Sequence, residues 1–114
     1  MDNILKRILE VLETNKFEAL SIERREDNFG GIFYSLKTYK GGVIWIRRNK
    51  YRNWWKKYFG LKDNVKIVAY TSRTQIYDFK VTEENEFYKN FNDVYEKIES
   101  MLVKSENENV LKYL

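Results

Sequence analysis

The sequence predicts an α+β fold: a single antiparallel sheet of about five strands, made of two hairpins plus one strand, with N-terminal, central and C-terminal helices. Apolar residues at helical spacing occur near both ends of the chain. Between them, β-rich runs are joined in pairs by turn residues. The length of 114 residues suits one domain, residues 1–114.

The first predicted elements are an amphipathic helix and a strand. In "DNILKRILEVLETNK" (2–16) the apolar residues recur at steps of one, three and four, and Asp2 or Asn3 caps this helix. In "FEALSIER" (17–24), Leu20 and Ile22 would share one face, so we interpret this run as the first strand. "EDNFGG" then supplies turn residues.

Two hairpins complete the predicted sheet. The first joins 31–39 to 42–48 through the glycine turn "KGG". The second joins 64–72 to 74–82 around Ser72 and Arg73.

A long helix follows the second hairpin. We expect Thr82 to cap it and Glu83, Glu84 and Glu86 to form an acidic first turn. Its predicted apolar stripe comprises Phe87, Phe91, Val94, Ile98, Met101 and Leu102. The tail, about 105–114, is polar and then apolar, so it extends the helix, docks on a partner subunit or frays.

The central segment "NKYRNWWKKYFG" (49–60) combines aromatic rings with cations. A helix over 50–59, with Asn49 as N-cap and Gly60 just past its end, places the rings within an arc of about 140°. An aromatic stripe at helical spacing usually packs into a core, so we expect these rings to be buried. They are Tyr51, Trp54, Trp55, Tyr58 and Phe59.

Positive charge is concentrated in the middle of the chain. The net charge is +4, but residues 37–66 carry ten basic residues against the single acid Asp63. An anionic partner, namely RNA, DNA or a ribonucleoprotein complex, would explain this basic block. The alternative is that the acidic terminal helices fold over the block and neutralise it.

Strand alternation in the first hairpin gives a second mixed surface. One face carries Tyr34, Leu36, Ile44 and Ile46, and the other carries Phe33, Lys37, Tyr39, Val43, Trp45 and Arg47. Rings beside cations suit base stacking with phosphate neutralisation. Alternatively, Phe33, Val43 and Trp45 lie beneath a helix or in a subunit interface. The predicted binding residues are Lys37, Tyr39, Trp45, Arg47, Arg48, Lys50, Arg52, Lys56 and Lys57.

The composition argues against much catalytic chemistry. With no histidine and no cysteine, the chain has no thiolate nucleophile, imidazole base or zinc site built on those residues. We expect a non-enzymatic protein without cofactor or metal. The catalytic alternative is a Mg²⁺-dependent nuclease, because Asp63, Asp78 and Lys80 resemble the PD-(D/E)xK motif, although Lys62 replaces its proline. The apolar runs are too short for a membrane span.

As a whole, the chain lacks His and Cys, is rich in Lys, Asn, Ile and Tyr, and has terminal helices around hairpins. In this it resembles the small orphan proteins of archaeal rod-shaped viruses (rudiviruses), a group that includes type III-B anti-CRISPR proteins. The resemblance implies a viral protein of the host cytoplasm that occupies an RNA–protein surface without catalysis. We also expect a homodimer, because the C-terminal tail is apolar and the sheet has two candidate apolar faces.

Overall fold

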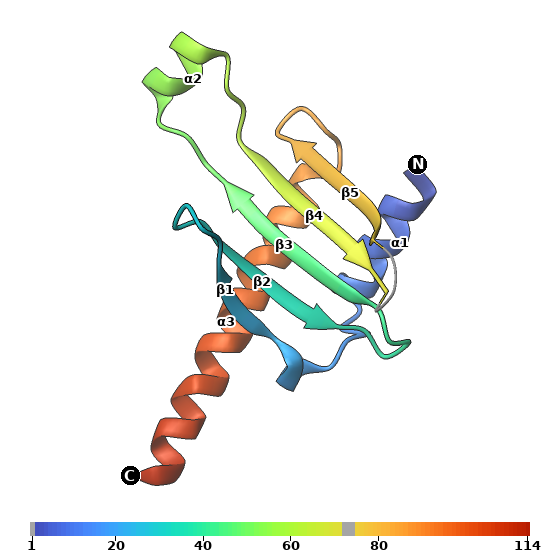
Figure 1. Cartoon of the computed structure of the whole chain (residues 1–114), viewed down its shortest axis with the longest axis vertical. Helices are drawn as coiled ribbons and strands as arrows, with labels where there is room; N and C mark the ends of the chain where they lie inside the picture. Colours follow the sequence, from blue (N-terminus) through green and yellow to red (C-terminus); the bar gives the residue numbers. More distant parts are fainter. Residues whose placement is uncertain (1, 72–74) are drawn as a thin grey trace.

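The chain folds into one antiparallel sheet with two long helices on the same face (Figure 1). The computed structural model describes residues 2–71 and 75–114. The elements are α1 (Asp2–Glu13), the 3₁₀ turn η1 (Ala19–Ser21), β1 (Glu23–Glu26), β2 (Ile32–Lys37), β3 (Val43–Asn49), α2 (Asn53–Phe59), β4 (Asn64–Tyr70), β5 (Gln75–Thr82) and α3 (Tyr88–Tyr113). The predicted α+β class and single five-stranded sheet are confirmed.

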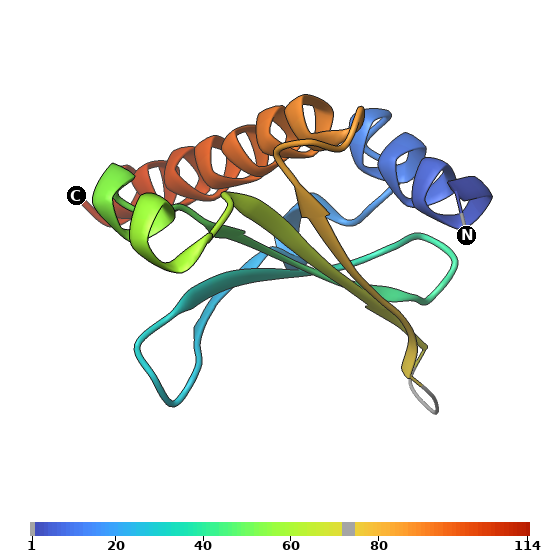
Figure 2. The same cartoon turned by 90° about the horizontal axis from the view of Figure 1, so that it is seen from above.

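The sheet is a meander in which every strand pairs with its neighbour in sequence, in the order β1-β2-β3-β4-β5. The register aligns Tyr34 with Ile46, Ile46 with Ile67, and Ile67 with Phe79. Figure 2 shows α1 and α3 together on one face of the sheet. No helix of the described chain covers the opposite face, which we call the open face.

The core lies between the sheet and the two helices. Tyr34, Leu36, Ile44 and Ile46 are all buried, which confirms the predicted face of the first hairpin. The predicted stripe of the C-terminal helix is also confirmed, because every member is buried or packs against the core. The core residues are Leu5, Ile8, Leu9, Leu12, Phe17, Ile22, Tyr34, Leu36, Ile44, Ile46, Val65, Ile67, Val81, Phe91, Val94, Tyr95 and Ile98.

A lysine on α3 joins the two helices. Lys97 Nζ donates to the carbonyl oxygens of Leu12 (2.6 Å) and Glu13 (3.3 Å) and to Asn15 Oδ1 (2.8 Å). These carbonyls lie at the C-terminal end of α1, where no further turn of helix supplies donors. The Lys97 ammonium group therefore caps the C-terminal end of α1 and holds α3 beside it.

The predicted first strand is wrong in its bounds. β1 covers only Glu23–Glu26, and the preceding residues form η1, because the Ser21 hydroxyl bonds the Glu18 carbonyl at 2.6 Å. Phe17 forms an isolated bridge with Thr38. Leu20 is 93% exposed whereas Ile22 is buried, so these two side chains do not share a face.

The C-terminal helix begins later than predicted. Thr82 is the last residue of β5 and not a cap, and α3 begins at Tyr88 with Phe87 as its N-cap residue. The backbone turns between them, since the Asn85 N–H donates to the Thr82 carbonyl and Asn85 Oδ1 accepts the Phe87 N–H. The tail extends the helix to Tyr113 and projects past the sheet (Figure 1).

The central helix is shorter than predicted. α2 begins at Asn53, and Asn49 is the last residue of β3, where it pairs with Asn64 instead of capping a helix. Gly60 ends α2 with φ 62°, the left-handed conformation predicted from its position. The strands of both hairpins are confirmed. The predicted turn at Ser72 and Arg73 lies outside the described residues.

Candidate nucleic-acid interface

The rings of α2 are exposed, so the prediction that they form core is wrong. The exposed fractions are 50% for Trp54, 40% for Trp55, 78% for Tyr58, 62% for Phe59 and 36% for Tyr51. α2 projects past the ends of β3 and β4, beyond the reach of the core (Figure 1). We call these five residues the aromatic tip.

Three rings of the aromatic tip, Trp54, Trp55 and Phe59, pack against one another. The Trp54 and Trp55 centroids are 4.4 Å apart, and Trp55 stacks on Phe59 at 5.0 Å with an interplanar angle of 27°. Three neighbouring cations, Lys50, Arg52 and Lys57, are exposed and form no salt bridge within the described residues. The tip therefore presents π faces beside unneutralised charge.

The base of α2 is anchored by ion pairs. Lys56 Nζ lies 3.0 Å from Asp63 Oδ2 and 3.4 Å from Glu83 Oε2, and Asp63 Oδ1 accepts the Tyr51 N–H at 2.9 Å. Burial raises the pKa of Asp63, but the Tyr51 N–H and the Lys56 ammonium outweigh it, so the pKa is lowered overall. Lys56 is consequently a structural contact here, although the sequence predicts it as a binding residue.

A basic cleft adjoins the aromatic tip. Its volume is about 450 Å³, and its lining includes the three cations Arg47, Arg48 and Lys50 and no acidic residue. Arg48 is held beside it by the Tyr95 ring, 4.6 Å from the guanidinium carbon, and by Glu96 at 3.1 Å. The lining residues are Gly30, Gly31, Ile32, Arg47, Arg48, Asn49, Lys50, Tyr51 and Tyr95.

A second hollow, which we call the sheet pocket, lies on the open face. It has a volume of about 310 Å³. It is lined by Asp27, Phe33, Trp45, Arg47, Lys66, Val68 and Asp78. Trp45 lies between Phe33 (centroids 5.2 Å apart) and Tyr70 (5.1 Å, edge-on), and its Nε1 has no hydrogen-bond partner in the described structure. No described helix covers Phe33, Val43 and Trp45, which removes that alternative within the chain.

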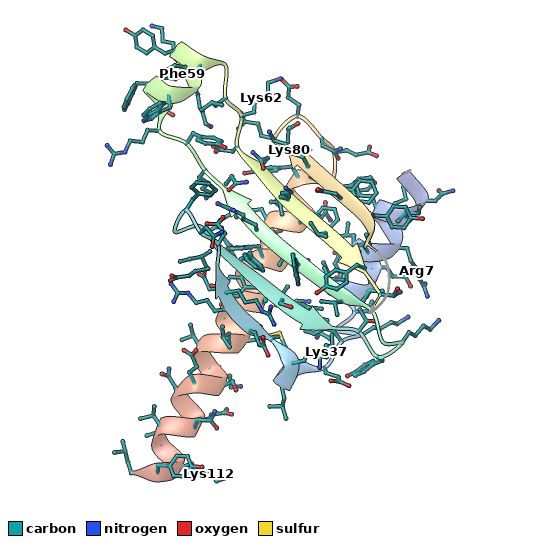
Figure 3. The ribbon with its side chains drawn as sticks, in the orientation of Figure 1. Arg7, Lys37, Phe59, Lys62, Lys80 and Lys112 are labelled. Atoms are coloured by element: carbon teal, nitrogen blue, oxygen red, sulfur yellow. The ribbon has the colours of Figure 1, made fainter. Side chains whose placement is uncertain are left out.

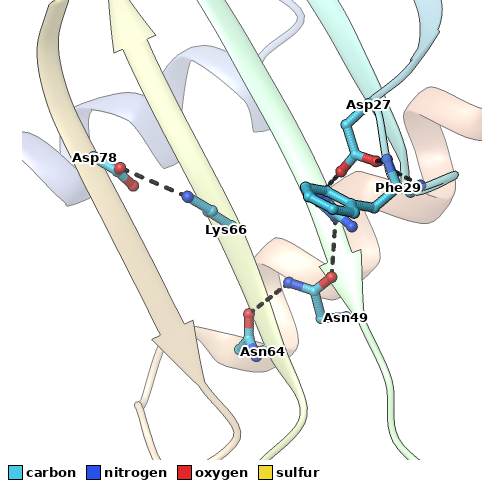
Figure 4. A network of polar contacts seen from close by, with 8 residues as sticks. Asp27, Phe29, Asn49, Asn64, Lys66 and Asp78 are labelled. Atoms are coloured by element: carbon cyan, nitrogen blue, oxygen red, sulfur yellow. Dashed lines mark hydrogen bonds and ion pairs between the residues drawn. The ribbon is translucent and has the colours of Figure 1, made fainter.

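Arg47 lines both the basic cleft and the sheet pocket, and a polar network fixes it (Figure 4). Its Nη1 pairs with Asp27, and its Nε donates to Asn49 Oδ1 at 3.1 Å. Asn49 Nδ2 in turn donates to the buried Asn64 at 3.0 Å. A Cβ at Gly31 would lie 1.9 Å from Arg47 Nη2, so glycine leaves the room that the guanidinium occupies.

Asp27 is fixed by its own turn. Its Oδ1 accepts the N–H groups of Gly31 (2.8 Å) and Phe29 (2.9 Å). These two hydrogen bonds, followed by the Arg47 guanidinium, hold the pKa of Asp27 below its usual value. The carboxylate is therefore a permanent partner of Arg47 near neutral pH.

The basic block is half neutralised. Arg47, Arg48, Lys56, Lys62 and Lys66 form salt bridges, with Asp27, Glu96, Asp63 and Glu83, Glu84, and Asp78 respectively. The helices do not lie across the block, since only Glu96 of these acids belongs to a helix. Lys37, Lys40, Lys50, Arg52 and Lys57 form no salt bridge to any described residue.

The predicted binding residues fall into two groups. Phe59 lies past one end of the sheet and Lys37 lies near the other end (Figure 3). Lys37 ends β2, and Tyr39, 69% exposed, belongs to the adjoining β2–β3 turn. The others line the basic cleft or sheet pocket or lie along the segment that carries α2: Trp45, Arg47, Arg48, Lys50, Arg52, Lys56 and Lys57.

The residues of the nuclease alternative are not brought together. Asp78 pairs with Val68, five residues beyond Asp63, which is about 16 Å along the strand. Asp78 lies beside Lys66 (3.8 Å), while Asp63 is engaged by Tyr51 and Lys56. Lys80 pairs with Lys66 across the strands. No group of three or more carboxylates that could hold a metal ion occurs among the described residues.

Sequence reasoning placed Phe33 on the face of Trp45 and Arg47, but it missed Lys66, Val68, Asp27 and Asp78 as their neighbours. The pairing of β3 with β4 brings Lys66 and Val68 opposite Arg47 and Trp45. Strand alternation followed from β3 to β4 and β5 is the signal that finds Lys66, Val68 and Asp78, whereas Asp27 lies in the turn between β1 and β2 and has no such signal.

Within the described ranges, no helix has the length and apolarity needed to span a membrane. Comparisons of the chain with family models, with curated proteins and with solved structures found no match. The function of the interface must therefore be inferred from its geometry and chemistry.

Proposed function

We propose that this protein is a non-catalytic binding domain that engages single-stranded nucleic acid, free or within a ribonucleoprotein complex. The aromatic tip stacks bases, and the cations Lys50, Arg52 and Lys57, together with the basic cleft, neutralise phosphates. One observation carries the proposal: four rings on α2 and Tyr51 just before it stand exposed beside three cations without salt bridges in the described chain.

Energetic reasoning supports a ligand for the tip. Exposed aromatic rings are unfavourable in water, and they cluster on binding surfaces. A base stacked on an aromatic side chain contributes about 1–3 kcal/mol, and every base has a π face. The tip and the basic cleft share Tyr51, so stacking and phosphate neutralisation occur on one continuous surface.

The resemblance to archaeal viral proteins points to the same partner class. An anti-CRISPR-like role, in the cytoplasm of a host cell, would have the tip occupy an RNA-bearing surface of a host complex. The proposal also includes a homodimer, supported by exposed apolar residues in the projecting end of α3. They are Val103, Val110, Leu111, Tyr113 and Leu114.

The test is binding of a fluorescein-labelled oligo(dT) or oligo(U) strand, followed by anisotropy. Trp54→Ala/Trp55→Ala should weaken binding by about 10-fold or more, because two stacking rings are lost. Lys50→Ala/Arg52→Ala/Lys57→Ala should also weaken it. The matched control is Lys89→Ala/Lys104→Ala/Lys112→Ala, which removes the same charge from exposed positions of α3 and should bind nearly as well as the unaltered chain.

Two outcomes separate the forms of the proposal. In the first, the unaltered chain binds free strands weakly but captures an RNA-containing complex, and this capture is sensitive to nuclease and lost in the tip variant. This outcome assigns the function to binding of a ribonucleoprotein complex. Equal binding by the tip variants and the unaltered chain in both assays would contradict the proposal.

A further inference from the structure

The sheet pocket differs in chemistry from the basic cleft beside it. Two acids and two cations line it, so its formal charge is zero, and phosphate has no net attraction to it. Its other lining residues are Phe33, Trp45 and Val68. A cavity of about 310 Å³ with apolar walls and a few polar groups suits a small ligand. This combination fits a flat, uncharged heterocycle that carries both donors and acceptors.

The polar groups of the pocket are unequally occupied. Asp27 accepts two backbone N–H groups and pairs with Arg47, so its role is to hold the guanidinium in place. Among the described residues Asp78 forms an ion pair with Lys66 alone, at 3.8 Å, which is beyond hydrogen-bond distance, and its side chain is 46% exposed. Asp78 is therefore free to accept hydrogen bonds from a ligand. Arg47 Nε and Nη1 already donate to Asn49 and Asp27, so Nη2, which has no hydrogen bond to any described residue, is the group that donates to a ligand.

The register places these groups around one spot. Trp45 pairs with Val68 and Val68 with Asp78, so these three lie in one row across the open face. The next row on that face contains Arg47 paired with Lys66. A ring resting on Trp45 and Val68 thus meets donors along one edge, at Arg47 and Lys66, and an acceptor at Asp78.

We propose that the sheet pocket holds a single guanine base of the bound strand, an inference that rests on the proposed function. Guanine presents two adjacent acceptors, O6 and N7, which an arginine pairs with bidentately. Its N1–H and N2–H₂ groups are adjacent donors, which match a carboxylate. The base rests on Trp45 and Val68 beside Phe33. Arg47 and Lys66 donate to O6 and N7, and Asp78 accepts from N1–H and N2–H₂.

The other bases fit less well. Adenine presents a donor amine beside N7, which faces the donors of Arg47, and uracil and thymine have no exocyclic amine for Asp78. Cytosine has one amine and no N7. The pocket should therefore read the base, while the aromatic tip and basic cleft bind strands of any sequence.

The tryptophans offer a direct test. Of the three in the chain, two belong to the tip, so Trp54→Phe/Trp55→Phe leaves Trp45 as the single tryptophan. In this variant we expect GMP to change Trp45 emission saturably, with a Kd about 10-fold or more below those of AMP, CMP and UMP. The phosphate is common to all four, so differences report the base. Calorimetry on the unaltered chain with the same nucleotides gives a second readout.

Asp78→Asn keeps the shape of the side chain but replaces one carboxylate oxygen with a donor group. It should bring the GMP affinity to within about 3-fold of the AMP affinity. Asp93→Asn, at an exposed position on α3, is the matched control and should leave the preference unchanged. Equal affinities for the four nucleotides, no binding by either method, or an unchanged preference in Asp78→Asn would each overturn the inference.

The two proposals can fail separately. If oligo(dT) binds through the tip while GMP shows no preference, the nucleic-acid function stands and the guanine pocket is wrong. If GMP binds selectively but no strand binds through the tip, the pocket recognises a free nucleotide and the proposed function is wrong.

Discussion

The Arg47 guanidinium lies on the open face and is held by Asp27 and Asn49, each of which has hydrogen bonds of its own. Asp27 is held by the N–H groups of its own turn, and Asn49 is held by the buried Asn64. These partners lie 20 residues before Arg47 and two residues after it, so one half of the network is local and the other is not. Such support keeps a ligand-binding side chain in a single orientation.

The carboxylate of Asp27 should make stability depend on acid pH. Its pKa in the fold lies below the ordinary value of 3.8, so the folded state binds fewer protons than the unfolded state. The stabilisation is complete above pH 3.8 and is lost as the pH falls through the folded pKa. Asp27→Asn should therefore lower Tm at pH 7, and the difference from the unaltered chain should shrink as the pH falls below 4.

This is measured by thermal unfolding followed by circular dichroism at several pH values. Asparagine still accepts the Phe29 and Gly31 N–H groups, so the variant tests the charge and not the turn. Asp93→Asn serves as the control at an exposed position. A Tm difference that stays constant from pH 7 to strong acid would show that the charge of Asp27 does not stabilise the fold.

At the scale of elements, the helices and hairpins were predictable wherever periodicity and burial agree. The α1 and α3 stripes and the alternation of β2 and β3 all meet the same core. For α2, periodicity shows only that the rings share one face, and says nothing about what that face meets. The predicted bounds of the first strand are wrong because the Ser21 hydroxyl donates to the Glu18 carbonyl, and the residues before β1 form η1. The sequence pattern does not indicate this hydrogen bond.

The basic cleft and the sheet pocket were predictable only where a residue's position along its own strand or segment places it there. Trp45, Arg47, Arg48 and Lys50 are found from composition and from their positions along β3 and just beyond it. Asp27 and Asp78 become their neighbours only through the pairing of whole strands and the turn before β2. Salt bridges such as Lys62 with Glu84 depend on the chain course between β5 and α3, which local sequence does not specify.

The exposed position of α2 predicts an unusual tolerance to substitution. Trp54→Ala/Trp55→Ala should cost about 1 kcal/mol or less of unfolding free energy, because these rings pack against each other and Phe59 and do not belong to the core. By contrast, Phe91→Ala empties a fully buried position and should cost about 3–5 kcal/mol. Urea unfolding of both variants makes the comparison. A loss of several kcal/mol in the tip variant would mean that α2 packs into a core after all.

At the scale of the whole molecule, the projecting end of α3 predicts self-association. Its apolar residues have no partner in the described chain and would be covered in a homodimer. Light scattering should give twice the chain mass of 13.9 kDa at high concentration. A chain ending at residue 104 should scatter as a monomer. Its far-UV circular dichroism should still show the sheet and the remaining turns of helix, which would confirm that the shortened chain is folded. If the full chain remains a monomer at high concentration, the dimer proposal fails.

Charge distribution predicts how binding should respond to salt. Each phosphate neutralised on a single strand adds about −0.7 to the slope of log affinity against log salt concentration, because bound counterions are released. Lys50, Arg52 and Lys57 have no acidic partner in the described chain, so each is free to neutralise one phosphate. Lys50→Ala/Arg52→Ala/Lys57→Ala should therefore make the slope shallower by about 2.

Lys89→Ala/Lys104→Ala/Lys112→Ala changes the net charge equally but should keep the original slope, since these lysines lie on α3. Anisotropy titrations at several salt concentrations measure both slopes. Equal loss of slope in the two variants would mean that overall charge, and not the surface around α2, attracts the strand.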